Sequence, residues 1–383
     1  MRYLLTTFIT LLFTSWNLFG QVGKETGTQD GELSLRIKSI SFVKNNEYFN
    51  PIIEGYTLLG FFFQPELVYS PSGKITLRAG THLLKYSGRE KFSQVRPVFS
   101  ASLNLSKKTT ITIGSLSGSD KHKLFDPLFN SERLYNDYLE DGVQLTTANN
   151  HFFNDTWVNW ENFIFKGDST QEIMTFGESF KYTSSTFSDF LQVEFPLQVQ
   201  VKHFGGQISN YPEHIETFLN LATGVRINFD LAHKRYGQAG IEYLQFFNNQ
   251  LNSHTDIANP QVINNESNGE FQHGIMHGYS YWLRLHYTYK GLYIGAAYWK
   301  SYNFLSPNGN NIYSSYSDYQ ANVVIPDRKI ITNTINLTIL PESYLELFLG
   351  LETYYDVALK RLDNSITLHL NFDKLIRLAT LKH

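Results

Sequence analysis

A long stretch of this chain alternates apolar and polar side chains with a period of two. In the run YWLRLHYTYKGLYIGAAYW, one side carries Tyr281, Leu283, Leu285, Tyr287 and Tyr289, and the other carries Trp282, Arg284, His286 and Thr288. Successive side chains of a β-strand point to opposite faces, so this pattern predicts a strand with one apolar face and one mostly polar face. Lys290 and Gly291 interrupt the run before it resumes, which indicates a tight hairpin.

The same alternation recurs along most of the chain. Apolar sets such as Leu345, Leu347, Leu349 and Leu351, or Ile366, Leu368, Leu370 and Phe372, alternate with polar neighbours. A soluble β-sandwich would show this pattern too, with the apolar face inside. Many of the predicted strands are long enough to cross a bilayer at a tilt, and aromatic residues gather at their ends. These two features favour a transmembrane antiparallel β-barrel over a secreted soluble β-protein.

Composition narrows the class further. The chain has 30 Phe and 24 Tyr, and aromatic residues are typical of strands. Its 32 Lys and Arg nearly balance 35 Asp and Glu and are scattered along the sequence, so no nucleic-acid partner is expected. The absence of cysteine excludes disulfides and thiolate metal sites. We find no metal-binding or phosphate-binding motif and expect no cofactor.

The N-terminus resembles an export signal. Arg2 is followed by the apolar stretch from Leu4 to Phe13 and by a short polar region that ends before Gln21. The apolar stretch is too short to cross the bilayer as a helix. We therefore predict a cleaved signal peptide at residues 1–20 and a single barrel domain at residues 21–383.

The connections between predicted strands alternate in length. Short ones lie at residues 70–73, 105–109, 166–169, 290–291 and 340–343, and long ones at 118–154, 248–278 and 305–328. In bacterial outer-membrane barrels the short turns are periplasmic and the long loops are external. We count 14 to 16 strands, because Pro196 and the Gly205–Gly206 pair leave either two or three strands between residues 190 and 230.

The whole mature chain resembles the porin-like outer-membrane barrels of Bacteroidota. The resemblance rests on the aromatic strand-rich body, on the signal ending Phe19-Gly20-Gln21, on the run from Phe195 to Gln207, and on a late strand that ends in Phe372. It implies a barrel in the outer membrane of a Gram-negative bacterium, in contact with lipid and with small solutes. It also implies that Phe372 is the terminal aromatic residue that the barrel-assembly machinery recognises, although Asp373 to His383 follow it.

If the apolar face meets lipid, a set of charged and polar side chains faces the lumen. The residues concerned are Arg78, Arg226, Arg284, His82, His286, Glu194, Glu346 and Glu352. Opposed charges of this kind can create a field that selects ions at a constriction. The alternative is that these side chains only pair with one another inside the barrel. Likewise, the loop from Gly118 to Asn154 either folds inward as a constriction or stands outside as a lid.

The predicted function is a porin-like channel for small hydrophilic solutes. The first alternative is a non-conducting barrel, either a surface-polysaccharide anchor or a transporter of apolar solutes. The second is a degenerate relative of outer-membrane phospholipase A, since Ser267-Asn268-Gly269 precedes Trp282-Leu283-Arg284. Ser267 lacks the adjacent histidine that a serine nucleophile needs, because Asn265 stands there. We therefore predict that the protein is not an enzyme.

Overall fold

The computed structural model describes residues 30–116, 118–184, 190–206, 208, 215–232, 234–251, 277–321, 323–341 and 343–381. The predicted signal peptide, residues 1–20, and the Ser267 motif lie outside these ranges. Within them no helix is long and apolar enough to cross a membrane.

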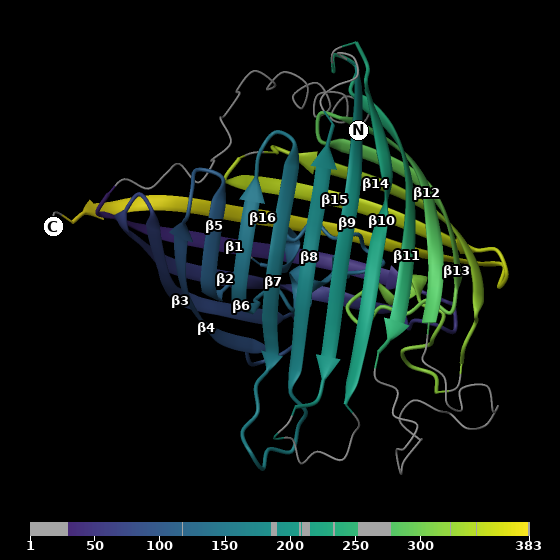
Figure 1. Cartoon of the computed structure of the whole chain (residues 1–383), viewed down its shortest axis with the longest axis horizontal. Helices are drawn as coiled ribbons and strands as arrows, with labels where there is room; N and C mark the ends of the chain where they lie inside the picture. The colour runs from purple at the N-terminus through teal and green to yellow at the C-terminus, as the bar shows by residue number, and fades with distance from the viewer. Residues whose placement is uncertain are drawn as a thin grey trace, which may run out of the picture.

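Sixteen antiparallel strands of the described chain form one closed barrel (Figure 1). They are β1 Glu32–Glu47, β2 Tyr56–Ser72, β3 Ile75–Tyr86, β4 Gln94–Asn104, β5 Thr109–Ser115, β6 Asp141–Ala148, β7 Phe152–Asn162, β8 Ile173–Thr183, β9 Leu191–Phe204, β10 Glu216–Asp230, β11 Gln238–Gln250, β12 His277–Tyr289, β13 Leu292–Tyr302, β14 Asp327–Ile339, β15 Leu345–Asp356 and β16 Arg361–Thr380. Each strand pairs with its sequence neighbours, and β1 pairs with β16 to close the barrel. The predicted fold class is confirmed.

The side of each strand that was predicted to face lipid does face outward. On β12, Leu283 and Leu285 are exposed, while Trp282 is buried inside the barrel. Exposed leucine, isoleucine, valine, phenylalanine and tyrosine side chains recur on every wall of the barrel. A closed barrel leaves no open sheet edge, and an apolar exterior is the surface that lipid requires.

Three details differ from the sequence-based expectations. The region between residues 190 and 230 holds two strands, because β9 continues through Pro196. The expected short turn at residues 166–169 belongs to the 163–172 connection, on the side of the long connections. The last strand does not end at Phe372: β16 pairs with β1 as far as Thr380, so Phe372 lies within the strand.

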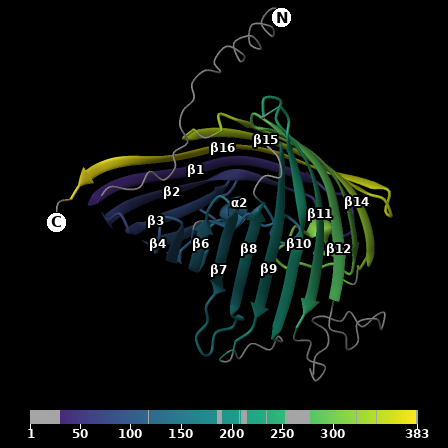
Figure 2. The same cartoon turned by 45° about the horizontal axis from the view of Figure 1, so that its top comes forward.

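Two long connections fold into the barrel instead of standing outside it. The 116–140 segment, between β5 and β6, contains the short helices η1 Ser119–Lys121 and α2 Arg133–Asn136, and Figure 2 shows α2 inside the ring of strands. The 303–326 segment, between β13 and β14, contains η4 Asn311–Tyr313. Of the two alternatives for the Gly118 loop, the inward one is correct for residues 118–140, and residues 141–148 form β6.

The two inner segments contact each other and the wall. The backbone N–H of Asn130 donates to the carbonyl of Asn308 (2.7 Å), and that of Asn310 donates to the carbonyl of Asp126 (2.9 Å). Around them lies a buried apolar cluster that includes Leu128, Phe246, Trp299 and Ile312. The half of the barrel at the end with the long connections therefore has a packed interior.

Candidate functional site: the barrel lumen

A row of alternating charges crosses the inner wall of neighbouring strands. In the register of the barrel, Glu194 on β9 lies directly opposite Arg226 on β10. Arg226 in turn lies opposite Glu242 on β11, and Glu242 lies opposite Arg284 on β12. The period-two pattern of each strand turns all four side chains inward, and the register of the barrel brings them side by side. Lys181 on β8 extends the row at its β9 end.

Every neighbouring pair in this charged row is in contact. Nε of Arg226 donates to Oε1 of Glu242 (2.8 Å), and its Nη1 donates to Oε2 of Glu194 (3.1 Å). Nη2 of Arg284 forms an ion pair with Oε2 of Glu242, and Nζ of Lys181 lies 2.6 Å from Oε1 of Glu194. Three cations against two carboxylates leave the row with one net positive charge.

The cations of the row remain accessible from the lumen. The side chains of Lys181, Arg226 and Arg284 are 36%, 25% and 21% exposed, whereas Glu242 is fully buried between the two arginines. Water inside the barrel therefore reaches the positively charged groups more than the carboxylates. A mobile ion in this space would meet a weakly positive surface.

Arg78 and His82 do not belong to this row and instead hold the 116–140 segment. Nε of Arg78 donates to Oγ of Ser100 (2.8 Å), and its Nη2 donates to the carbonyl of Ser115 at the entry to the segment (2.9 Å). His82 is buried, hydrogen-bonds with Gln64 through Nδ1 (2.8 Å), and stacks against Tyr138 of the segment.

The other predicted lumen residues lie on the inner face but are dispersed. Oε2 of Glu352 is 3.5 Å from Nζ of Lys44, which in turn lies 3.4 Å from Oε1 of Glu132 in the 116–140 segment. His286 stacks on Tyr293 below the charged row. Glu346 lies on the inner face at the start of β15, away from the row. The predicted set thus divides into the charged row, the anchors of the 116–140 segment, and separate wall residues.

Sequence reasoning missed one anchor of the 116–140 segment, His122. Its Nδ1 hydrogen-bonds with Oδ2 of Asp155 on β7 (2.9 Å), and its Nε2 hydrogen-bonds with Glu140 at the far end of the segment. The imidazole is completely buried and lies flat on Trp157, whose ring covers Gly177. No local pattern in the loop sequence identifies this residue, because its partners come from distant positions.

The environment of His122 favours its charged form. Burial alone would lower the pKa of the imidazole, but the negative charge of Glu140 and the hydrogen bonds with Asp155 and Glu140 outweigh burial and raise the pKa to about 9. His122 is therefore a buried cation at neutral pH, held between two carboxylates. We call His122, Glu140 and Asp155 the histidine latch.

A second buried ion pair fixes the 303–326 segment. Arg328 on β14 donates from Nη2 to Oδ2 of Asp356 on β15 (2.9 Å), and its Nη1 donates to the carbonyls of Ile312 (2.7 Å) and Ser314 (2.6 Å). Both side chains of the pair are essentially buried. Since a buried charge is costly without such partners, this arrangement ties the segment to the wall.

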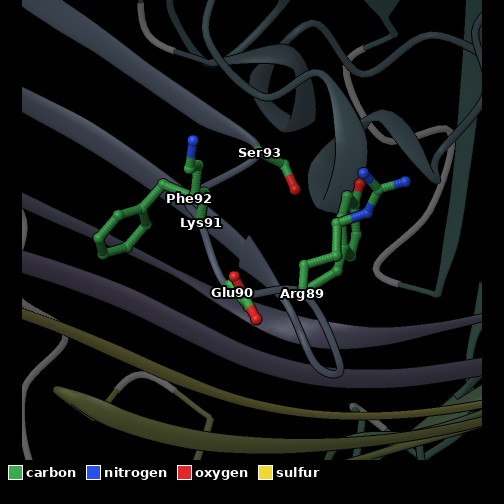
Figure 3. A pocket seen from close by; sticks show the side chains of 6 residues that line it. Arg89, Glu90, Lys91, Phe92 and Ser93 are labelled. Carbon is green, nitrogen blue, oxygen red and sulfur yellow. The ribbon is translucent and has the colours of Figure 1, made fainter.

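A pocket of about 610 Å³ lies apart from the lumen row, at the hairpin between β3 and β4. It is lined by Tyr86, Arg89, Glu90, Lys91, Phe92 and Ser93, and Figure 3 shows Arg89 and Phe92 pointing to opposite sides. In the described part of the chain, no group of three or more His, Asp or Glu side chains is placed to hold a metal ion.

The sequence matches the model of a known family, described as lipid A 3'-O-deacylase-type, over residues 25–381. The chain belongs to this family. No curated protein matches the sequence. The description of the family names an enzymatic activity on lipid A.

Several solved structures resemble this chain at low sequence identity. OccK11 (OpdR) of Pseudomonas aeruginosa is 13% identical, with 92% of this chain and 99% of that one covered and a TM-score of 0.49. OprD of the same organism is 10% identical, with coverage of 94% and 97% and a TM-score of 0.44. An anion-selective porin from Comamonas acidovorans is 11% identical, with coverage of 90% and 100% and a TM-score of 0.48. These likenesses are too distant to assign a solute or a residue role to this chain.

Proposed function

We propose that this protein is an outer-membrane channel that passes small hydrophilic solutes through a lumen narrowed by the 116–140 and 303–326 segments. The observation that carries the proposal is the charged row from Lys181 to Arg284, whose cations are accessible within the barrel. Rings and rows of charge at a narrow point set ion preference in channels. The net positive charge of the row predicts a weak preference for anions.

Conductance and ion selectivity of the purified protein in a planar bilayer test the proposal. Arg284→Gln removes one positive charge, while Glu242 keeps its contact with Arg226. The reversal potential across a salt gradient should shift toward cations, and the shift should shrink between 0.1 M and 1 M salt as the Debye length falls from about 10 Å to about 3 Å. Lys166→Gln is the control, because it removes the same charge from an exposed position in the connection between β7 and β8, outside the lumen.

An absence of conducting steps would reject the channel, provided that it is found in the wild type and also in a variant in which residues 119–139 are replaced by a short Gly-Ser linker. That result would favour the non-conducting alternatives, a surface-polysaccharide anchor or a transporter of apolar solutes. A conducting protein whose reversal potential is unchanged by Arg284→Gln would instead reject the role of the charged row in ion selection.

A second candidate function is deacylation of lipid A, and one site on the outer wall favours it. His203 on β9 and Thr217 on β10 are level with each other and point away from the lumen, with Nδ1 2.9 Å from Oγ1. Both lie near the barrel end with the long connections, which is the external end in barrels of this type. An imidazole that accepts the proton of a hydroxyl group is the basic unit of nucleophilic ester hydrolysis.

The surroundings of this pair suit an acyl chain. Met174 on β8 is level with His203, and Trp160 on β7 is level with Met174, so an apolar row leads to the pair. In such a reaction Thr217 would attack the ester carbonyl as His203 takes its proton, the sugar hydroxyl would leave with that proton, and water would then release the fatty acid. Loss of lipid A deacylation in both His203→Ala and Thr217→Val, measured by mass spectrometry of lipid A from expressing cells, would support this candidate.

A further inference from the structure

Neutral polar side chains without hydrogen-bond partners gather on the inner wall of β11, β12 and β13. Within the described part of the chain, Oδ1 of Asn248, both amide atoms of Gln250, and the hydroxyl groups of Ser280 and Ser301 are buried and unpaired. None of these four residues is more than 6% exposed. We call this group, together with Trp282 and Trp299, the tryptophan wall.

The register of the barrel brings these groups together. Ser280 is level with Ser301, and one step further along the inner faces Trp282 is level with Trp299. On β11, Phe246 is level with Ser280, and Asn248 is the next inward residue. The indole N–H groups of both tryptophans also lack partners. The tryptophan wall therefore combines two large rings with a set of donors and acceptors, and it contains no charged residue.

Burying a polar group without a hydrogen-bond partner destabilises the folded state, and native proteins keep few such groups. Several such groups on one wall indicate that something other than protein satisfies them. Water can supply hydrogen bonds, but it gains nothing from the indole rings. A solute whose ring has hydroxyl groups at its edge and C–H groups on its face would use both features.

The 303–326 segment covers this wall with aromatic rings and offers few polar partners. Phe304 lies 5.1 Å from Trp299 between ring centroids, and Tyr313 lies 5.0 Å from Trp299 and 5.6 Å from Trp282. The polar contact of the wall with this segment is a long hydrogen bond, 3.3 Å, from Nδ2 of Asn248 to the carbonyl of Asn303. The 303–326 segment thus covers the indole rings, while the hydroxyl groups of Ser280 and Ser301, Oδ1 of Asn248 and the side-chain amide of Gln250 stay unpaired.

We propose that the tryptophan wall is a binding site for the ring of a neutral sugar, which takes the place of Phe304 against Trp299. The proposal rests on the channel function, because it names the class of solute that the lumen would admit. Sugar hydroxyl groups pair with Ser280, Ser301, Asn248 and Gln250, and the sugar face packs on the indole rings. Two cations border the site: Arg284 lies 4.7 Å from the centroid of the Trp282 ring, and Arg328 lies opposite Ser301 in the register. Each already pairs with a carboxylate, Glu242 or Asp356, so a charged solute would find no free partner to compensate its desolvation.

Calorimetric titration of the folded protein with maltotriose, in a detergent that carries no sugar, tests the site without requiring conduction. Phe304→Ala removes the cover, so maltotriose should bind this variant at least about tenfold more tightly than the wild type. Adding Ser280→Ala and Ser301→Ala to Phe304→Ala should weaken binding by about tenfold for each lost hydrogen bond. Titration with gluconate, an anionic sugar acid, should release no binding heat from the wild type or from either variant.

The control variant adds Ser179→Ala to Phe304→Ala, because Ser179 is an equally buried serine on the inner face of β8. Retention of the heat-dependent gel shift of folded barrels shows that each variant is assembled. Maltotriose binding that is lost only in the Ser280 and Ser301 variant supports the site. No binding by assembled Phe304→Ala, or equal binding by all variants, overturns it. Binding by a protein that conducts no ions would reject the channel and leave the site standing.

Discussion

His122 lies flat on Trp157, with ring centroids 3.6 Å apart and 9° between the ring planes. Trp157 belongs to the barrel wall, and His122 belongs to the 116–140 segment inside the barrel. The contact therefore joins this segment to the wall. Since both nitrogens of the imidazole also hydrogen-bond with carboxylates, the histidine latch holds the 116–140 segment at a single place.

His122→Asn should loosen this segment. The substitution leaves Glu140 and Asp155 buried without their cation, and breaking a buried ion pair in this way costs about 3–5 kcal/mol. We expect larger and more frequent current steps in planar bilayers while the barrel still assembles. Lys121→Gln is the control, because this exposed neighbour lies outside the latch. Identical currents from both variants and the wild type would mean that the histidine latch does not control how far the 116–140 segment narrows the lumen.

The latch should also respond to alkaline pH. Relative to its ordinary value of 6.5, the pKa of His122 is raised to about 9 by the two carboxylates, despite burial. A raised pKa in the folded state gives a stabilisation that is complete below about 6.5 and is lost as the pH rises through about 9. Arg133 also faces the latch, with its Nη2 3.9 Å from Oε1 of Glu140. Conductance should therefore rise between pH 7 and pH 10 in the wild type and stay flat in His122→Asn.

The assignment of the apolar face to lipid can be tested, because the free-energy cost of placing a charge on that face depends on its depth in the bilayer. Leu283→Arg places a cation at the middle of β12 and should destabilise the barrel by about 2–4 kcal/mol. Leu362→Arg, near the end of β16 that follows the 357–360 connection, should destabilise the barrel by only about 0–1 kcal/mol. The two leucines are similarly exposed, Leu283 to 44% and Leu362 to 56%, so the difference would reflect depth in the bilayer. Urea titrations in lipid vesicles measure both. Equal costs would contradict the assignment of this face to lipid.

The orientation of the barrel in the membrane can be determined by labelling a single engineered cysteine in each of two variants, since the native chain has no cysteine. Lys166, in the connection between β7 and β8, and Lys107, in the turn between β4 and β5, are both exposed and lie at opposite ends of the barrel. With intact cells, a membrane-impermeant maleimide should label Lys166→Cys and leave Lys107→Cys unlabelled. Labelling of Lys107→Cys alone would reverse the orientation.

The sequence predicted what depends on local periodicity. Alternation placed Leu283 outside and Arg284 inside, and the same rule placed Glu194 and Arg226 on the lumen side, because a strand presents every second residue to one face. The strand range of 14 to 16 includes the sixteen that form the barrel. The pairing of Arg226 with both neighbours follows only from register, which a single strand does not encode.

What the sequence did not predict depends on contacts between distant segments. The 116–140 segment has no periodic pattern that distinguishes an inward fold from an outward one, so its anchors at Arg78, Lys44 and His122 were not recognised as anchors. Phe372 was taken for the strand end because an aromatic residue closes an apolar alternation there. The strand continues because β1 supplies a partner as far as Thr380, beyond the last residue that pairs with β15.

The unequal lengths of the strands have a consequence for the surrounding bilayer. β5 has 7 residues and spans about 23 Å along its own direction, and the tilt of barrel strands makes its height smaller still. β2 and β16, with 17 and 20 residues, are far taller. An outer-membrane barrel usually presents an apolar band about 25 Å tall, so the wall at β5 falls short of the hydrocarbon thickness. This hydrophobic mismatch should thin the bilayer beside β5 and tilt the barrel toward the side of β2 and β16. A thin bilayer should therefore accommodate the protein best.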